Sequence, residues 1–207
     1  MPALQGDFGR GDTGELMEWP SPHCQPFRDL LSLPRMVRIM LDLIGPGFHH
    51  SSANGIVMDA GAEGQTMHGG QRSDGSRGRR DAWTYSIDRN GHIECNLINV
   101  MYQLTDIGPE DGGTLVVPGS HKAFFNLPPE VRDITAACDR FHDQTGGALL
   151  KRVPCKAGSA LIFTEALSHG CAPWRAPHQR RTMLCPHLQS YPAHLATRAP
   201  MILMSFV

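Results

Sequence analysis

Short apolar runs separated by glycine and proline turns are the feature that most limits the fold of this chain. The 207 residues include 22 glycines and 16 prolines, and many of them cluster between apolar runs, as at 45–47, 106–113 and 118–119. Such close punctuation is typical of an all-β protein with tight connections and not of a helix bundle. The sequence therefore predicts a mainly β fold of the jelly-roll, sandwich or barrel type.

Composition and charge exclude several kinds of partner. The formal net charge is −1, with both signs spread along the chain, whereas a nucleic-acid-binding protein needs a basic surplus on one face. The same balance argues against electrostatic docking to a membrane. No apolar run approaches the roughly 20 residues that span a bilayer, and the first ten residues lack the apolar core of a signal peptide. We therefore expect a cytoplasmic protein with no nucleic-acid or membrane partner.

One domain is expected, after an extended leading segment. Residues 1–22 are rich in glycine, proline and acidic residues and predict an extended N-terminal segment, so the domain takes up residues 23–207. Within residues 26–43, apolar side chains recur at helical spacing, and Pro34 divides this stretch into two short helices or one kinked helix. The Gly-Pro-Gly triplet at 45–47 ends it.

The remaining elements are mostly strands. Apolar or β-branched runs predict strands at residues 55–58, 92–104, 114–117, 160–163 and 180–185. The polar stretch 71–91 predicts a long surface loop, residues 128–146 a helical insertion, and the tail from Tyr191 a loop. The six cysteines form no C-x-x-C pair, so we expect free thiols, mostly buried.

Two of the eleven histidines stand out by their neighbours. His68 precedes a glycine pair, and His169 follows an apolar strand and precedes a glycine. Small neighbours leave room for a ligand to approach each ring, and two imidazoles from separate strands are a common way to hold iron. Each histidine taken alone is more often structural, and sequence spacing does not decide between the two readings.

An arginine pair follows the second histidine. Arg180 lies eleven residues after His169 and is followed by Arg181. Neighbouring residues of a strand face opposite sides, so only one of the two can point into a barrel. A lone arginine there is costly unless it meets an anion, such as a dicarboxylate bound through two hydrogen bonds. That both arginines are surface groups fits the spacing equally well.

Two segments resemble the phytanoyl-CoA dioxygenase family. The stretch DGGTLVVPGSHKAFFNLP (111–128) resembles the family's signature strand and turn, and KAGSALIFTEALSHGCAPW (156–174) its distal-histidine strand. MHGG around His68 lies where the family has its first metal histidine, and Arg180 lies at the family's usual distance after the second. The resemblance runs from about Trp19 to Leu188.

The resemblance implies a double-stranded β-helix, a cupin-like jelly roll, with flanking short helices. It also implies an Fe(II)- and 2-oxoglutarate-dependent dioxygenase that hydroxylates or otherwise oxidises a small organic substrate. His68 and His169 would be metal ligands, and Arg180 would anchor the 2-oxoglutarate. His121, in the turn of the signature segment, is read as structural.

One position departs from the family pattern. The family has an aspartate two residues after its first histidine, and this chain has Gly70 there. Three explanations stay open. A carboxylate from elsewhere, such as Glu165, Asp74 or Glu63, completes the metal shell; water or a halide fills the position, as in related halogenases; or the site has decayed or been repurposed.

The rival functions follow from this departure. A non-catalytic or metal-poor family member would act as a binding protein, and a halogenase-like variant is the second alternative. A cupin-like sugar-processing protein would fit the fold but not Arg180. The family also has a longer helical region before its core than residues 26–43 provide, so a shortened member or a fragment is expected.

Overall fold

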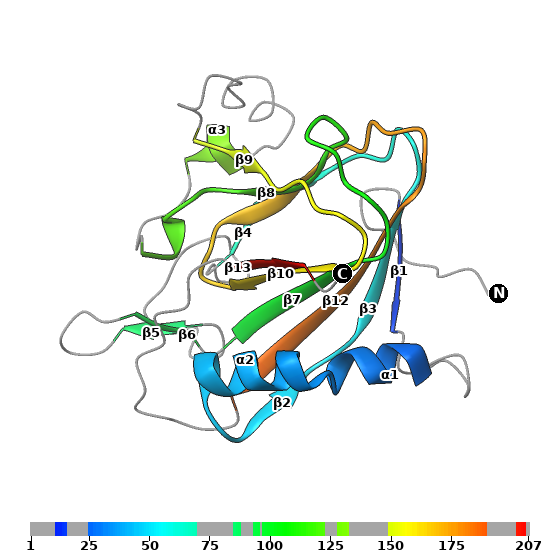
Figure 1. Cartoon of the computed structure of the whole chain (residues 1–207). Helices are drawn as coiled ribbons and strands as arrows, with labels where there is room; N and C mark the ends of the chain where they lie inside the picture. Colours follow the sequence, from blue (N-terminus) through cyan, green and yellow to red (C-terminus); the bar gives the residue numbers. More distant parts are fainter. Residues whose placement is uncertain are drawn as a thin grey trace.

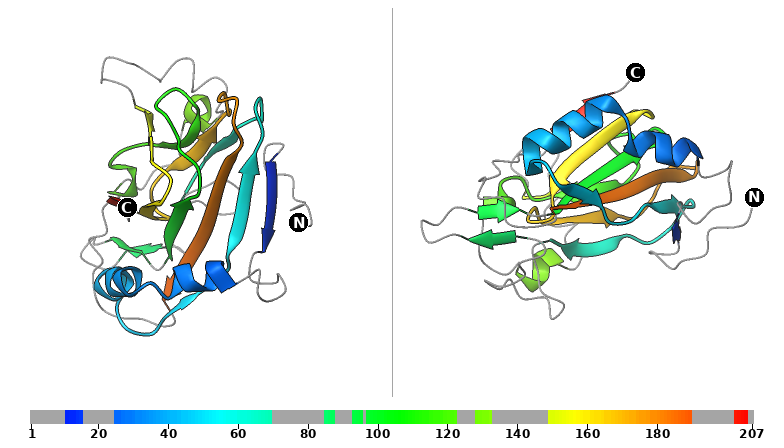
Figure 2. Two further views of the ribbon diagram at one scale, coloured as in Figure 1. Left: turned by 45° about the vertical axis from the view of Figure 1, so that its right-hand side comes forward. Right: turned by 90° about the horizontal axis from the view of Figure 1, so that it is seen from below.

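A computed structural model describes residues 11–15, 25–69, 85–87, 93–95, 97–122, 128–132, 149–189 and 202–205. These residues form two antiparallel sheets that face each other, with two helices across the outer face of the larger one (Figures 1 and 2). This is the arrangement of a double-stranded β-helix with flanking short helices, so the predicted fold is confirmed. None of the described helices is long and apolar enough to cross a membrane.

The larger sheet carries one wall of the interior. Its strand order is β1 (Gly11–Glu15), β3 (Asn54–Met58), β12 (Arg180–Gln189), β7 (Leu97–Gln103), β10 (Ser159–Thr164) and β13 (Ile202–Ser205), and β2 (Phe48–His50) pairs with one end of β12. Each described pairing in this sheet is antiparallel. Long antiparallel strands with alternating side chains can serve two layers at once, one on each face.

The smaller sheet forms the opposite wall. Its order is β4 (Gln65–His68), β11 (His169–Ala172), β8 (Gly113–Val116) and β9 (Lys151–Arg152). A separate hairpin is made of β5 (Tyr85–Ile87) and β6 (Ile93–Cys95). The signature turn adds a short 3-10 helix, Ser120–Lys122, and a four-residue helix, α3 (Pro129–Arg132), follows it.

The helices cover the outer face of the larger sheet. They are α1 (Gln25–Leu31) and α2 (Pro34–Ile44), so the predicted break at Pro34 is confirmed. Proline suits the first position of a helix because its missing N–H would have no partner there. The buried face of α2 and the outward side chains of the sheet form one apolar cluster, which includes Met36, Met40, Ile44, Val100, Ile162 and Met183.

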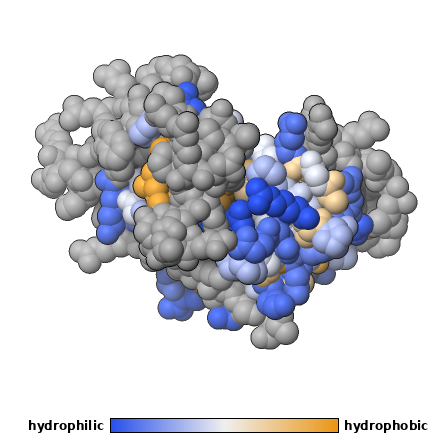
Figure 3. Space-filling model, turned by 90° about the horizontal axis from the view of Figure 1, so that it is seen from above, coloured by the Kyte–Doolittle hydropathy of each residue, from blue (hydrophilic) through white to orange (hydrophobic). Residues whose placement is uncertain are grey.

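Loops close the upper end of the two sheets. Two ion pairs lie at this end. Lys156 Nζ pairs with Asp106 Oδ2, and Arg152 Nη1 pairs with Glu110 Oε2, both at 2.9 Å. Seen from this end, the described surface on the right is mostly hydrophilic (Figure 3). The pair of Lys156 and Asp106 is exposed at both ends, and such a pair adds little stability, typically below about 1 kcal/mol.

Four sequence expectations need correction or restriction. The stretch 71–91 is not loop throughout, since residues 85–87 pair with 93–95 as a hairpin. Residues 92–104 hold two strands rather than one, and the tail contains β13. Of the helical insertion 128–146, only residues 128–132 are described, with α3 in them. The expected boundary between residues 22 and 23 stays a prediction.

Candidate functional site

A cavity of about 330 Å³ lies between the two sheets. The larger sheet contributes side chains from β3, β7, β10 and β12, and the smaller sheet from β4, β8 and β11. Its lining residues are Ile56, Gln65, His68, Leu97, Asn99, Met101, Thr114, Phe163, Glu165, His169, Gly170, Cys171, Arg180, Leu184 and Pro186. All three residues singled out as candidate ligands, His68, His169 and Arg180, are among them.

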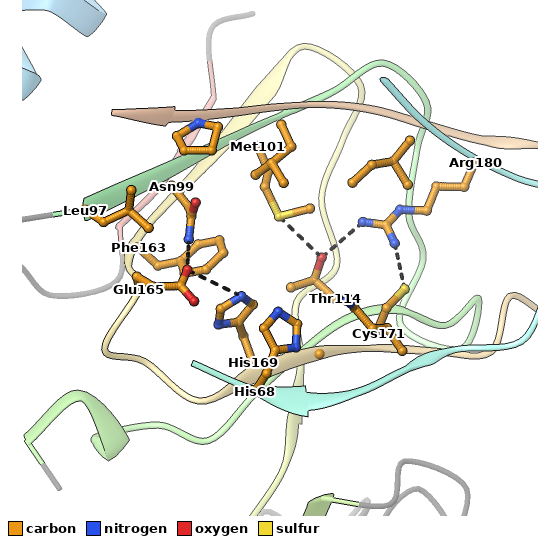
Figure 4. Close-up of a pocket in the computed structure, with 15 residues that line it drawn as sticks. His68, Leu97, Asn99, Met101, Thr114, Phe163, Glu165, His169, Cys171 and Arg180 are labelled. Atoms are coloured by element: carbon orange, nitrogen blue, oxygen red, sulfur yellow. Dashed lines mark hydrogen bonds and ion pairs between the residues drawn. The ribbon is translucent and has the colours of Figure 1, made fainter. Parts of the chain in front are cut away.

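The two histidines lie side by side on paired strands. His68 ends β4 and His169 begins β11, and their Cα atoms are direct partners in the antiparallel register. Their ring centroids are 4.2 Å apart (Figure 4). Since metal–nitrogen bonds are about 2 Å long, rings this close can share one ion.

Each imidazole is oriented by a backbone carbonyl two residues earlier in the chain. Nδ1–H of His68 donates to the carbonyl oxygen of Thr66 at 2.9 Å, and Nδ1–H of His169 donates to that of Leu167 at 2.8 Å. This tautomer leaves the lone pair of each ring on Nε2, the atom that would bind a metal. Burial, together with the neighbouring His68, lowers the pKa of His169 to about 3, so this ring is neutral at physiological pH.

Arg180 is buried at the other side of the cavity. It is 1% exposed, and its Nη1 donates to Cys171 Sγ at 3.0 Å and to Met58 Sδ at 3.4 Å. Nη2 donates to Thr114 Oγ1 at 3.1 Å, while Nε has no hydrogen-bond partner among the described residues. No carboxylate of the described chain forms an ion pair with it. A buried cation among neutral, weak acceptors is suited to receiving an anion.

The signature segment supports the second histidine. Ser120 Oγ accepts a hydrogen bond from the backbone N–H of Ser168 at 2.7 Å, and the N–H of Val117 donates to the carbonyl of Ser168 at 2.9 Å. Both bonds hold the residue just before His169. His121 does not line the cavity, and the structural role expected for it stays a prediction.

Opposite the arginine, a carboxylate lies close to the histidines. Glu165 Oε2 is 4.0 Å from His169 Nε2 and accepts a hydrogen bond of 2.6 Å from Asn99 Nδ2. In Figure 4 the imidazoles lie between this pair and Arg180. Among the described residues, no three His, Cys, Asp or Glu side chains are already arranged around a common metal position.

The other sequence candidates fall outside the cavity or outside the described chain. Glu63 is exposed and Arg181 faces solvent, whereas Gly70 and Asp74 lie outside the described residues. Cys155, Cys171 and Cys185 are buried free thiols. Burial raises the pKa of the Cys155 thiol to about 11, although the charge of Arg180 acts in the opposite direction.

Sequence reasoning missed Asn99, Thr114 and Cys171. Asn99 carried a usable signal, because it is a polar residue within the apolar run LINVM, and a buried amide in a strand needs a partner. Thr114 and Cys171 are direct partners in the register between β8 and β11. Only the pairing of those strands shows that both side chains meet Arg180.

The sequence matches the family model of phytanoyl-CoA dioxygenases (PhyH) over residues 24–182, which is more than half of the chain. No curated protein sequence matches it at a significant level.

Several solved structures share the fold. HygX from Streptomyces hygroscopicus, solved with nickel, 2-oxoglutarate and hygromycin B bound, is 22% identical with a TM-score of 0.68, over 95% of this chain and 81% of HygX. AviO1 from Streptomyces viridochromogenes Tue57 is 19% identical with a TM-score of 0.55, over 86% of this chain and 67% of AviO1. The nickel complex of ThoJ, a non-heme monooxygenase, is 16% identical with a TM-score of 0.51, over 87% of this chain and 60% of ThoJ. At these identities the likeness is one of fold.

Proposed function

The chain belongs to the phytanoyl-CoA dioxygenase family, and we propose that it is an Fe(II)- and 2-oxoglutarate-dependent dioxygenase that hydroxylates or otherwise oxidises a small organic substrate. One observation carries the proposal: a single cavity holds two histidines with Nε2 lone pairs and a buried arginine that no carboxylate pairs with in the described chain.

The histidines fit a divalent metal. Both rings present Nε2 because their Nδ1–H groups donate to backbone carbonyls, and imidazole nitrogen is a ligand that iron, nickel and zinc accept. Backbone partners fix the ring orientations before any metal arrives, which lowers the cost of binding. His68 and His169 would therefore hold the metal.

Arg180 fits the far carboxylate of 2-oxoglutarate. Its Nε lacks a hydrogen-bond partner in the described chain, and its other donors reach only two sulfur atoms and a hydroxyl. A carboxylate would replace weak acceptors with charge-assisted hydrogen bonds. Thr114 Oγ1, already 3.1 Å from Nη2, would lie beside that carboxylate.

The bound metal and 2-oxoglutarate would supply the oxidising chemistry with O₂, and the protein would supply position and shelter. Part of the cavity wall is apolar, with Leu97, Phe163 and Leu184 among its lining residues. Such a wall keeps water from the reacting atoms. Of the relatives, HygX binds hygromycin B; for this chain we propose only a small organic molecule.

An anaerobic titration tests the proposal. Fe(II) and then 2-oxoglutarate are added to the metal-free protein, and the visible charge-transfer band of the chelate is recorded. We expect the band with the parent and its loss in a His68→Ala, His169→Ala double variant. Co(II) binding measured by calorimetry provides a second reading that does not depend on turnover.

Absence of the band would overturn the proposal. If the parent binds neither Fe(II) nor Co(II) and consumes no 2-oxoglutarate, the chain is a non-catalytic binding protein that keeps the family fold. If metal binds and chloride ions alter the spectrum of the complex, the halogenase-like alternative replaces hydroxylation.

A further inference from the structure

We propose that Glu165 supplies the carboxylate ligand that the family places two residues after its first histidine, and that Asn99 positions this carboxylate. The inference rests on the proposed function, because it concerns the same metal. It assigns the third ligand to the turn between β10 and β11 instead of the segment after β4.

The distance between the groups is close to that of two ligands on one ion. Glu165 Oε2 lies 4.0 Å from His169 Nε2. Ligand atoms about 2.1 Å from a metal, at octahedral or tetrahedral angles, are about 3.0–3.4 Å apart. A side-chain movement of roughly 1 Å would therefore bring Oε2 to the distance from His169 Nε2 that two ligands of one ion have, a change within the reach of a glutamate rotamer.

Asn99 keeps the carboxylate turned toward the histidines. Its side chain is 4% exposed and donates from Nδ2 to Glu165 Oε2 at 2.6 Å. Asn99 is on β7, opposite Phe163 of β10 in the register, so the donor comes from the larger sheet. A neutral amide orients a carboxylate without cancelling its charge, which is how partners of metal ligands commonly act.

The backbone brings the same turn against the end of β4. Gly69, with φ +119°, lies so close to this turn that an added Cβ would overlap the carbonyl oxygen of Leu167 and lie 3.0 Å from that of Glu165. The turn carrying Glu165 therefore packs directly beside the residue that follows His68. A carboxylate on this turn reaches the histidines from a neighbouring segment, where the family pattern would use residue 70.

The resulting set of metal ligands would have the same net charge as the family's ligand set. Two neutral imidazoles and one carboxylate would hold the metal, as in a 2-His-1-carboxylate site. Glu165 is part-buried, with 18% of its side chain exposed, so pairing with a divalent cation would offset much of the cost of burying its charge.

Glu165→Gln is the decisive variant. Glutamine keeps the size of the side chain and an oxygen that accepts the Asn99 hydrogen bond, but it removes the anionic ligand. We expect Co(II) affinity, measured by anaerobic calorimetry, to fall by roughly tenfold or more, with a changed visible Co(II) spectrum. The same substitution at the exposed Glu63, Glu63→Gln, is the matched control, and this variant should bind Co(II) like the parent. Asn99→Ala should change the Co(II) spectrum while Glu165 is intact.

A second substitution tests whether a carboxylate at residue 70 can replace the one at residue 165. In the Glu165→Gln background, Gly70→Asp restores the family pattern and should recover Co(II) affinity. Parent-like affinity and spectrum in Glu165→Gln would overturn the inference and leave the proposed function standing, since the parent still binds metal. A parent that binds no Co(II) would overturn the proposed function itself. Melting temperatures of the metal-free variants, expected to match the parent, separate ligand loss from unfolding.

Discussion

A cation buried among sulfur atoms and a hydroxyl costs the folded protein free energy. Arg180 lies in such an environment, where its guanidinium donates to Cys171, Met58 and Thr114. Replacing buried charges by apolar side chains of similar volume is often neutral or stabilising. A buried arginine here is therefore unfavourable for stability, which supports the proposed binding of an anion.

Arg180→Met should therefore separate binding from folding. We expect 2-oxoglutarate affinity of the Co(II)-loaded protein to fall by roughly thirty-fold or more, because a buried charge-assisted contact is worth at least about 2 kcal/mol. The melting temperature should stay equal or rise. Arg181→Met, at an exposed neighbour, should change stability by no more than about 0.5 kcal/mol. An unstable Arg180→Met variant with unchanged affinity would identify the guanidinium as purely structural.

Strand alternation predicted that only one of the two arginines can face the interior, and the family resemblance pointed to Arg180, which is buried. The same rule did not locate Glu165, because a turn residue has no alternation to follow. Its approach to His169 depends on the pairing of β10 with β7 and on the close contact at Gly69. These are long-range features that a local pattern does not contain.

At the scale of elements, β7 joins the helices to the cavity. Ile98 and Val100 belong to the apolar cluster under α2, whereas Asn99 and Met101 line the cavity. Tyr102 also faces the helices, and its hydroxyl donates a hydrogen bond to the carbonyl of Leu30 at 2.9 Å. The helices therefore support the wall that holds Asn99.

Met40→Ala should test how much this support contributes. Met40 is fully buried in α2, and truncating a buried methionine typically costs about 2–5 kcal/mol. We expect a loss in that range in urea unfolding. The neighbouring Leu41 is 41% exposed, so Leu41→Ala should change stability by less than about 0.5 kcal/mol. Equal effects of the two variants would show that α2 contributes little through its buried face.

Some elements were readable from sequence and others were not. The helix break followed from Pro34, and the end of α2 from Gly45, whose φ is +77°. The strand Ile202–Ser205 was missed because the prolines near it suggested a loop. Its pairing with the edge of β10 provides hydrogen-bond partners that local propensity does not reveal.

At the scale of the whole molecule, buried neutral histidines make stability depend on pH. His187 is 2% exposed, donates from Nδ1 to the carbonyl of Cys185 at 2.9 Å, and packs against the ring of His50. Burial lowers the pKa of His187 from 6.5 to about 4, with His50 acting in the same direction and the Cys185 carbonyl against it. The unfolded chain therefore takes up this proton at a higher pH than the folded one.

The stability contributed by neutral His187 is complete above pH 6.5 and is lost as the pH falls to about 4. The shift corresponds to at most about 3 kcal/mol. Urea unfolding from pH 7.5 to 4 should show this decline in the parent and a smaller one in His187→Leu. His169, whose pKa is also lowered, adds a decline of the same sign to both proteins, so their difference isolates His187. Parallel pH profiles would contradict the prediction.

The hydrogen bonds that hold the two imidazoles have a consequence for protein engineering. Each ring is fixed by a carbonyl two residues earlier in the chain, that of Thr66 in β4 for His68 and that of Leu167 in the turn before β11 for His169. The orientation therefore depends on the two paired strands and also on the turn that precedes β11. A designer who grafts the pair onto another sheet would therefore have to transfer the turn before β11 and the bonds of Ser120 and Val117 to Ser168 together with the two short strands.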